Sequence, residues 1–179
     1  MSNYRIERIH PDSEELDLLV RMYTDVFAHP PWGEQHRPVD VRKTFERVLS
    51  YPEAIVLVAL DSDNVQLGAA LAFSMERKAE LRLRLSRPGR GLFIDELFVA
   101  AFAHQRGIGA ALAAKVVAAA QSDTFDYAVI STSVYEPAIR HLFCDRHKFT
   151  VAFEDDYQGR HLLPTAILPT RRLVLVGSL

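Results

Sequence analysis

Apolar and polar residues recur along the chain at two periods, and each change of period marks a new element. Residues 4–9 alternate between polar and apolar side chains, which predicts a strand. From residue 12 or 13 to residue 27, apolar side chains recur every three or four positions. This spacing predicts a helix that ends before the prolines at 30 and 31. A second helix is expected over residues 39–49.

The rest of the chain alternates between short apolar runs and helical patterns. These predict strands over residues 54–60, 65–74, 92–99, 127–132, 149–153 and 171–176, and helices over residues 107–121 and 137–147. A single helix separates the strands at 92–99 and 127–132, so we expect these two strands to be parallel with a right-handed crossover. The pattern indicates an α/β fold in which residues 1–179 form a single domain.

The composition is that of an ordinary globular protein. Of the 179 residues, 49% are hydrophobic and 25% are charged, which is enough for a substantial core. A net charge of −2 gives no general attraction to nucleic acid or to an anionic membrane, so neither is an expected partner. No apolar run approaches the roughly 18 residues that a membrane span needs. The single cysteine, Cys144, excludes an internal disulfide, and we expect a cytoplasmic protein.

The most informative segment joins the strand at 92–99 to the alanine-rich helix at 107–121. It contains Gly107-Ile108-Gly109, so two positions at the start of the helix carry no Cβ atom. The first N–H groups of a helix have no partner within the helix, and the helix dipole places positive potential there. This arrangement is typical of a phosphate-binding site.

Other interpretations of the two glycines are less consistent with the sequence. A dinucleotide-binding motif requires a third glycine where this chain has Leu112, and seven residues, 100–106, separate the strand from Gly107. The Gly-Lys-Ser/Thr of a nucleotide-hydrolysing P-loop is absent from this segment. A purely structural role, in which the glycines let the helix pack closely on the sheet, is the remaining alternative.

The segment resembles the acyl-CoA-binding region of the GCN5-related N-acetyltransferase (GNAT) family. Gln105-Arg106-Gly107-Ile108-Gly109-Ala110, preceded by Leu97-Phe98-Val99, is similar to the family's Arg/Gln-x-x-Gly-x-Gly/Ala pattern after a strand that ends in Val. The chain departs from that pattern at His104, where Arg or Gln is usual. The resemblance implies a mixed, centrally splayed β-sheet flanked by helices on both faces, the acyl-CoA N-acyltransferase fold. It also implies acetyl-CoA as the acyl donor.

For the cofactor, the resemblance implies contacts with two backbone segments. The diphosphate would lie against Gln105, Arg106, Gly107, Ile108, Gly109 and Ala110, and the pantetheine arm against Leu97, Phe98 and Val99. In the family, the strand at 92–99 splays from the strand at 127–132, and the pantetheine arm occupies the gap like an additional strand. Because backbone amides bind the diphosphate in the family, we expect His104 to be tolerated.

Acyl transfer to an amine requires a group that accepts the ammonium proton. Asp95 and Glu96 lie in an otherwise apolar strand, where a carboxylate is costly unless it has a partner or a task. Adjacent strand residues point to opposite faces, so at most one of the two is expected to face the cleft. The resemblance implies that one of them is the general base, and the sequence does not separate them. A salt bridge, for example with an arginine of segment 76–90, is the alternative for either residue.

The tyrosine that protonates the leaving sulfur in the family has no counterpart in residues 137–149. Depending on the alignment, Cys144, Leu142 or Phe143 takes its position, and the helix is longer than in the family. Cys144 is therefore one candidate proton donor and Tyr135 another, while departure of the thiolate without a protein acid is the third alternative. As a non-catalytic residue, Cys144 would be a small buried hydrophobe.

The resemblance places acceptor recognition near the predicted connection between the first two helices. Trp32 could wall a pocket or stack on a cation, or it could instead fix both helices on the sheet. Glu34 could attract a protonated amine, and residues 155–157 could add negative charge or form a surface turn. We interpret the basic segment 76–90 as a solvated connection between strands. Its alternative role is contact with an anionic acceptor or with the outer phosphate of the cofactor.

The sequence thus predicts an enzyme, an N-acetyltransferase that transfers the acetyl group of acetyl-CoA to a primary amine of a small molecule or peptide. A non-catalytic acyl-CoA-binding sensor or interaction module is the alternative, because the usual tyrosine is missing. A nucleotide-binding oxidoreductase is disfavoured by the length of the loop at 100–106. Dimers are common in the family, so a homodimer is a further alternative. In such a dimer the strand at 171–176 could contribute a sheet edge.

Overall fold

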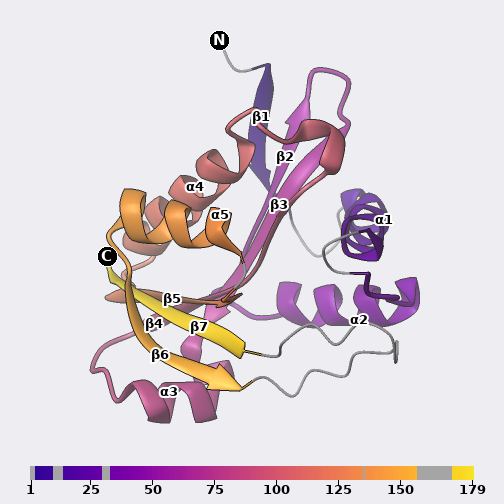
Figure 1. Ribbon diagram of the computed structural model, residues 1–179. Coiled ribbons are helices and arrows are strands. Elements are labelled where there is room, and N and C mark those ends of the chain that lie inside the picture. Colours follow the sequence, from indigo (N-terminus) through magenta and orange to yellow (C-terminus); the bar gives the residue numbers. More distant parts are fainter. Residues whose placement is uncertain (1–2, 10–13, 30–32, 135, 157–170) are drawn as a thin grey trace.

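The computed structural model describes residues 3–9, 14–29, 33–134, 136–156 and 171–179. Within these ranges, the strands form one sheet in the order β1-β2-β3-β4-β5-β7-β6 (Figure 1). They are β1 (Tyr4–Arg8), β2 (Ile55–Asp61), β3 (Gln66–Ser74), β4 (Gly91–Val99), β5 (Tyr127–Ser133), β6 (Thr150–Asp156) and β7 (Arg171–Ser178).

Helices flank the sheet on both faces. They are α1 (Glu15–Ala28), α2 (Pro38–Leu49), α3 (Ala79–Leu85), α4 (Ile108–Ser122) and α5 (Pro137–Arg140), with the 3₁₀ turns η1 (Met75–Arg77) and η2 (Ala101–Ala103) and the π-helical turn η3 (His141–Arg146). Figure 1 shows α1 and α2 on one side of the sheet and α4 and α5 on the other. The predicted α/β class, a mixed sheet between helical layers, is confirmed.

The central strands β2 and β3 are buried along almost their whole length rather than at every second residue. Helices exclude water from both sides of these strands, so both faces must be apolar. The alanine-rich sequence of α4 serves the same packing, because Ala113 and Ala120 are completely buried and let the helix axis approach the sheet. Burial of this apolar surface is the main stabilising contribution to the fold.

The sheet splays at its centre, as the family resemblance implied. β4 and β5 are parallel, and α4 connects them. Their pairing runs from Gly91 and Tyr127 to Ile94 and Ile130, and it stops there although both strands continue. β5 instead keeps its partner β7 along its full length, residues 127–133. A gap therefore opens between the C-terminal ends of β4 and β5.

Segment 76–90 is more ordered than the solvated connection that the sequence predicted. It contains most of η1 and the short helix α3, in which Leu81 and Leu85 pack against the core from one helical face. Its basic side chains bond to the protein itself: Arg84 pairs with Asp155 of β6 at 2.8 Å, and Arg82 with Glu76 at 2.9 Å. Figure 1 shows α3 beside β6, at one end of the sheet.

Candidate active site

β4 presents an open backbone edge to the gap, beyond its last pair with β5. On its other side β4 pairs with β3, and the N–H of Ala100 donates to the carbonyl of Leu67 at 2.9 Å. Hydrogen bonds alternate along an antiparallel pair. The backbone groups of Phe98 therefore turn toward β3, whereas those of Leu97 and Val99 turn toward the gap. Of the three strand residues predicted to contact the cofactor, these two offer it backbone groups.

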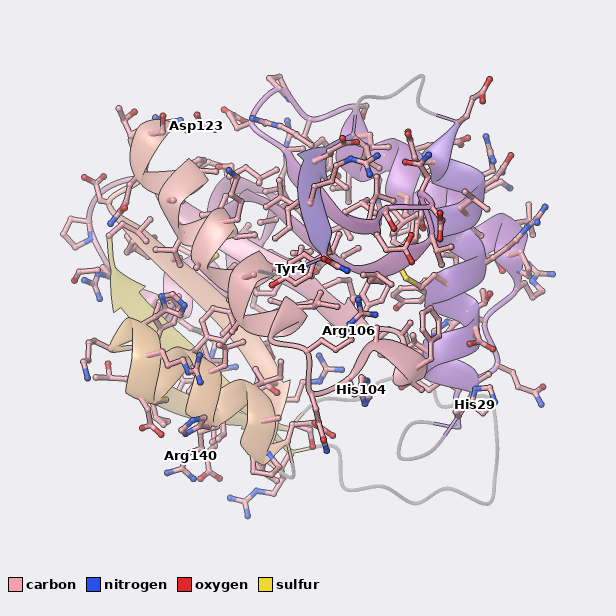
Figure 2. All side chains as sticks on the ribbon, turned by 90° about the horizontal axis from the view of Figure 1, so that it is seen from above. Tyr4, His29, His104, Arg106, Asp123 and Arg140 are labelled. Atoms are coloured by element: carbon pink, nitrogen blue, oxygen red, sulfur yellow. The ribbon has the colours of Figure 1, made fainter. Side chains whose placement is uncertain are left out.

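The loop between β4 and α4 has the geometry of an anion-binding turn. Gly107 precedes the helix with φ of 75°, and no side chain caps the first turn. The first helical hydrogen bond runs from the N–H of Ala111 to the carbonyl of Gly107 at 3.0 Å. The N–H groups of residues 108–110 therefore have no acceptor within the helix. Figure 2 shows the loop residues His104 and Arg106 between α4 and α1.

Packing of the helix on the sheet does not explain the two glycines. A Cβ atom at Gly107 would meet nothing within 4 Å. At Gly109 it would lie 3.6 Å from Cγ2 of Val99 and 3.9 Å from Cδ2 of Leu97, which is ordinary van der Waals contact. The protein would thus accept an alanine at Gly109, while the positive φ of Gly107 favours glycine there. The arrangement leaves Cβ-free backbone beside unpaired N–H groups, as close approach of a phosphate requires.

A β-bulge in β4 changes the direction of its two acids. Leu71 and Ala72 are neighbours in β3, yet they pair with Glu96 and Ile94, so Asp95 is an extra residue in β4. A bulge interrupts the alternation of side chains between the two faces of a sheet. Both carboxylates consequently lie on the face covered by α1 and α2. The prediction that the two acids point to opposite faces is therefore wrong.

Asp95 takes part in an ion pair with segment 76–90. Its Oδ1 lies 3.1 Å from Nζ of Lys78. The same ammonium lies over the ring of Phe93, 4.6 Å from its centroid, so Asp95 and Phe93 share one face of the strand. The salt bridge considered as an alternative for these acids therefore exists at Asp95, with a lysine in place of an arginine. This partner gives Asp95 a structural reason to be there.

Glu96 is the acid with the perturbed ionisation. Burial, followed by the negative charge of Asp95, raises the pKa of Glu96 from its ordinary value to about 8. The hydroxyl of Tyr23 donates to its Oε1 at 3.2 Å, and this bond and the charge of Arg172 in β7 act in the opposite direction on the pKa. A carboxyl group that titrates near neutral pH is suited to accept a proton from an amine.

Tyr23 of α1, which lies in the segment with apolar side chains at helical spacing, holds Glu96 in place. Its ring packs against Phe27, Phe45 and Phe98 at centroid distances of 4.4, 5.3 and 5.3 Å. Burial and the nearby charge of Glu96 raise the pKa of the Tyr23 phenol, so it stays protonated and can only donate to the carboxylate. A polar hydroxyl on an apolar helical stripe is the one sequence signal for this role.

The predicted acceptor residue Glu34 lies near this pair, held by its own partners. Its backbone N–H donates to the carbonyl of Phe27 at 2.8 Å, and its Oε2 lies 2.7 Å from Nε2 of His36. The His36 ring contacts that of Tyr23, with centroids 5.3 Å apart. The charge of Glu34 raises the pKa of both Tyr23 and Glu96, so the three side chains share one electrostatic environment. The sequence interpretation did not single out His36.

The other predicted acceptor residues are not part of this cluster. Trp32 and Tyr157 lie outside the described residues, as does the side chain of Asp156. Asp155 pairs with Arg84 of α3 at 2.8 Å. Its negative charge is thereby compensated, and it lies within strand β6 rather than in the surface turn considered as the alternative.

The candidate proton donor Cys144 lies in η3. Its side chain is partly buried against the core, and its neighbour Phe143 is completely buried. The turn is π-helical and so accommodates one more residue than an α-helical turn does. No hydrogen bond within the described part of the chain joins Cys144 to Glu96 or Tyr23. Tyr135 lies outside the described residues.

The splayed sheet, the Cβ-free turn and the acid at the bulge define the class of protein. The model of the acetyltransferase (GNAT) family matches residues 17–149, which is most of the chain. The chain belongs to this family. No curated protein matches the sequence.

Solved structures show the same fold over the whole chain. A ribosomal-protein-alanine N-acetyltransferase from Brucella melitensis superposes with a TM-score of 0.74 at 16% identity, covering 98% of this chain and 99% of that one. NAA60 of Arabidopsis thaliana in complex with acetyl-CoA gives 0.73 at 19% identity, with 98% of each chain covered. A GNAT family acetyltransferase from Elizabethkingia anophelis with acetyl-CoA bound gives 0.67 at 14% identity over 100% of both chains.

No helix among the described residues has the length and apolar character needed to cross a membrane.

Proposed function

We propose that the protein is an N-acetyltransferase that transfers the acetyl group of acetyl-CoA to a primary amine of a small molecule or peptide. The observation that carries this proposal is the position of Glu96. A carboxyl group with a pKa of about 8 stands at the bulge of β4, immediately before the strand's open edge. The same strand leads into the turn at Gly107, so a base and an anion-binding site lie at two ends of one gap.

The geometry of this chain fits acetyl-CoA at two places, the turn at Gly107 and the open edge of β4. The N–H groups of residues 108–110, with the Cβ-free backbone of Gly107 and Gly109, would bind the diphosphate. The backbone groups of Leu97 and the N–H of Val99, which face the gap, would pair with the pantetheine arm, as an added strand pairs with a sheet edge. Bound acetyl-CoA supplies an activated acetyl thioester.

Glu96 would act as the base that accepts the proton of the acceptor ammonium. An ordinary alkyl ammonium has a pKa of about 10.4, and a carboxylate with a raised pKa is a better match for it than an unperturbed one. Tyr23 orients the carboxylate through its hydrogen bond. The N–H of Leu97 is a candidate donor to the acyl oxygen, because it faces the gap next to Glu96.

On the acceptor side, the negative charge of Glu34 supports recognition of an amine in its ammonium form. His36 fixes the Glu34 carboxylate, and the rings of Tyr23 and Phe27 add aromatic surface. For the leaving sulfur, Cys144 is the candidate proton donor, and departure without a protein acid is the alternative. Thiols ionise at a pKa of about 8.5, so a thiolate is a good leaving group near neutral pH.

Two measurements test the proposal. Calorimetric titration with acetyl-CoA, with NADH as the control ligand, should show binding of acetyl-CoA alone. Release of free CoA thiol over a panel of amines and peptides should then identify the acceptor, and Glu96→Gln should abolish turnover while keeping acetyl-CoA affinity. Binding without turnover of any amine would instead favour the non-catalytic acyl-CoA sensor. Absence of acetyl-CoA binding would refute both.

A further inference from the structure

His104 occupies the position at which the chain departs from the family pattern, and its side chain bonds to the end of β4. Its Nε2 lies 3.0 Å from the carbonyl oxygen of Val99. A carbonyl oxygen can only accept, so Nε2 carries the hydrogen of this bond. Val99 is the last residue of β4, and its carbonyl is one of the backbone groups that turn toward the gap.

The bond closes the loop that precedes the anion-binding turn. Within the loop, the N–H of Ala103 donates to the carbonyl of Ala100 at 2.8 Å, which forms the compact turn η2. The chain then leaves the turn through Gln105, with φ of 60°, and Gly107, with φ of 75°. A left-handed conformation is unfavourable for a residue with a Cβ, so Gln105 adopts it only where the surrounding contacts impose it.

Two anchors bracket this strained stretch. On one side is the His104 side chain, bonded to the sheet through Val99; on the other is Ile108, the first residue of α4, which is 1% exposed. Residues 105–107 are themselves exposed. Their backbone conformation, and with it the direction of their N–H groups, thus depends on what holds the stretch at each end.

We propose that His104 is a positioning residue for the diphosphate of acetyl-CoA. By holding the Val99 carbonyl, it fixes the loop in the conformation that aims the backbone N–H groups of residues 105–110 at the anion. The role rests on the proposed function, and it differs from the expectation that a histidine is merely tolerated here. In this role the side chain must be long enough to bring one nitrogen atom, Nε2, to the carbonyl of Val99.

That reach defines a matched pair of variants. A glutamine amide nitrogen extends about as far from the backbone as Nε2 of histidine, whereas an asparagine amide nitrogen extends only as far as Nδ1. His104→Gln can therefore keep the bond to Val99, and His104→Asn cannot. Both replacements are neutral and polar at an exposed position, so the thermal unfolding temperature should be unchanged in His104→Gln and should fall in His104→Asn only by what the bond to Val99 contributes.

The test compares two ligands. Calorimetry measures the affinity of each variant for acetyl-CoA, and NMR titration measures the affinity for pantetheine, which lacks the diphosphate. His104→Asn should bind acetyl-CoA about fivefold more weakly than the wild type, the factor that corresponds to one net hydrogen bond. His104→Gln should retain wild-type affinity, and pantetheine should bind all three proteins equally. In the free wild-type protein, the ¹⁵N spectrum of the imidazole should show a protonated Nε2.

The contrary outcomes are distinct. Equal affinity of His104→Asn and wild type for acetyl-CoA would overturn the inference and leave the proposed function intact. An equal loss for pantetheine and acetyl-CoA would place the effect at the strand edge rather than at the diphosphate, and would also overturn it. Failure of the wild type to bind acetyl-CoA would refute the proposed function and this inference together.

Discussion

Replacement of Tyr23 by phenylalanine isolates the hydrogen bond that tunes the candidate base. The variant removes the hydroxyl that donates to Glu96 at 3.2 Å and keeps the ring among its aromatic neighbours Phe27, Phe45 and Phe98. Packing is therefore preserved, and the change acts on the ionised carboxylate alone. Without the donor, that ionised form is less stable, so the pKa of Glu96 should rise further above about 8.

The size of the rise follows from the strength of the bond. A hydrogen bond to a charged group contributes about 1.5–3 kcal/mol, and the length of this one places it at the lower end. Since one pKa unit corresponds to about 1.36 kcal/mol, the pKa should increase by about one unit. At pH 7, the ionised fraction of Glu96 would then fall roughly tenfold.

The assay is the pH dependence of kcat/KM with an acceptor amine. A base must be deprotonated to act, so activity rises as pH passes its pKa, and this rise should move by about one unit to higher pH in the Tyr23→Phe variant. The acceptor amine contributes the same ionisation in both proteins, so the difference reports on Glu96. Tyr51→Phe is the matched control, because that ring lies against Phe73 instead. An unchanged midpoint, or one at lower pH, would refute the assigned hydrogen bond.

Three further results are expected. Asp95→Asn removes a negative charge that raises the pKa of Glu96, so the same rise in activity should move to lower pH, opposite to Tyr23→Phe. Because the folded-state pKa of Glu96 lies above its unfolded value, the native protein binds the extra proton between pH 4.5 and about 8, and stability should fall as pH rises through this window. Urea unfolding at pH 6 and pH 9 should show this fall in unfolding free energy, a few kcal/mol, in the wild type, and Glu96→Gln should remove it. Gly109→Ala fits the protein, so calorimetry should show weaker acetyl-CoA binding with unchanged or increased thermal stability, whereas unchanged affinity would exclude close phosphate approach at Gly109.

Much of the architecture could be predicted from the sequence because local periodicity carries it. Apolar runs such as residues 54–60 predicted buried strands, and the single helix between residues 99 and 127 predicted the parallel pair β4 and β5. The short helix α3 was missed because its seven residues complete barely two turns and mix charged and apolar side chains. A period cannot be recognised over so short a segment.

The site depended more strongly on the tertiary structure. The candidate phosphate-binding turn is a local feature, so Gly107 and Gly109 could be singled out from spacing alone. Asp95 and Glu96 were found as unusual acids, but the bulge that turns both to one face arises from the register between β3 and β4, which no single strand encodes.

The contact of Tyr23 with Glu96 joins residues 73 positions apart, on a helix and a strand. The chain by itself determined which segments became helices and strands and where an anion could bind, because those properties depend on neighbouring residues. Only the packed fold decided which acid is buried beside a phenol, because the dielectric surroundings and charges that shift a pKa come from distant parts of the chain.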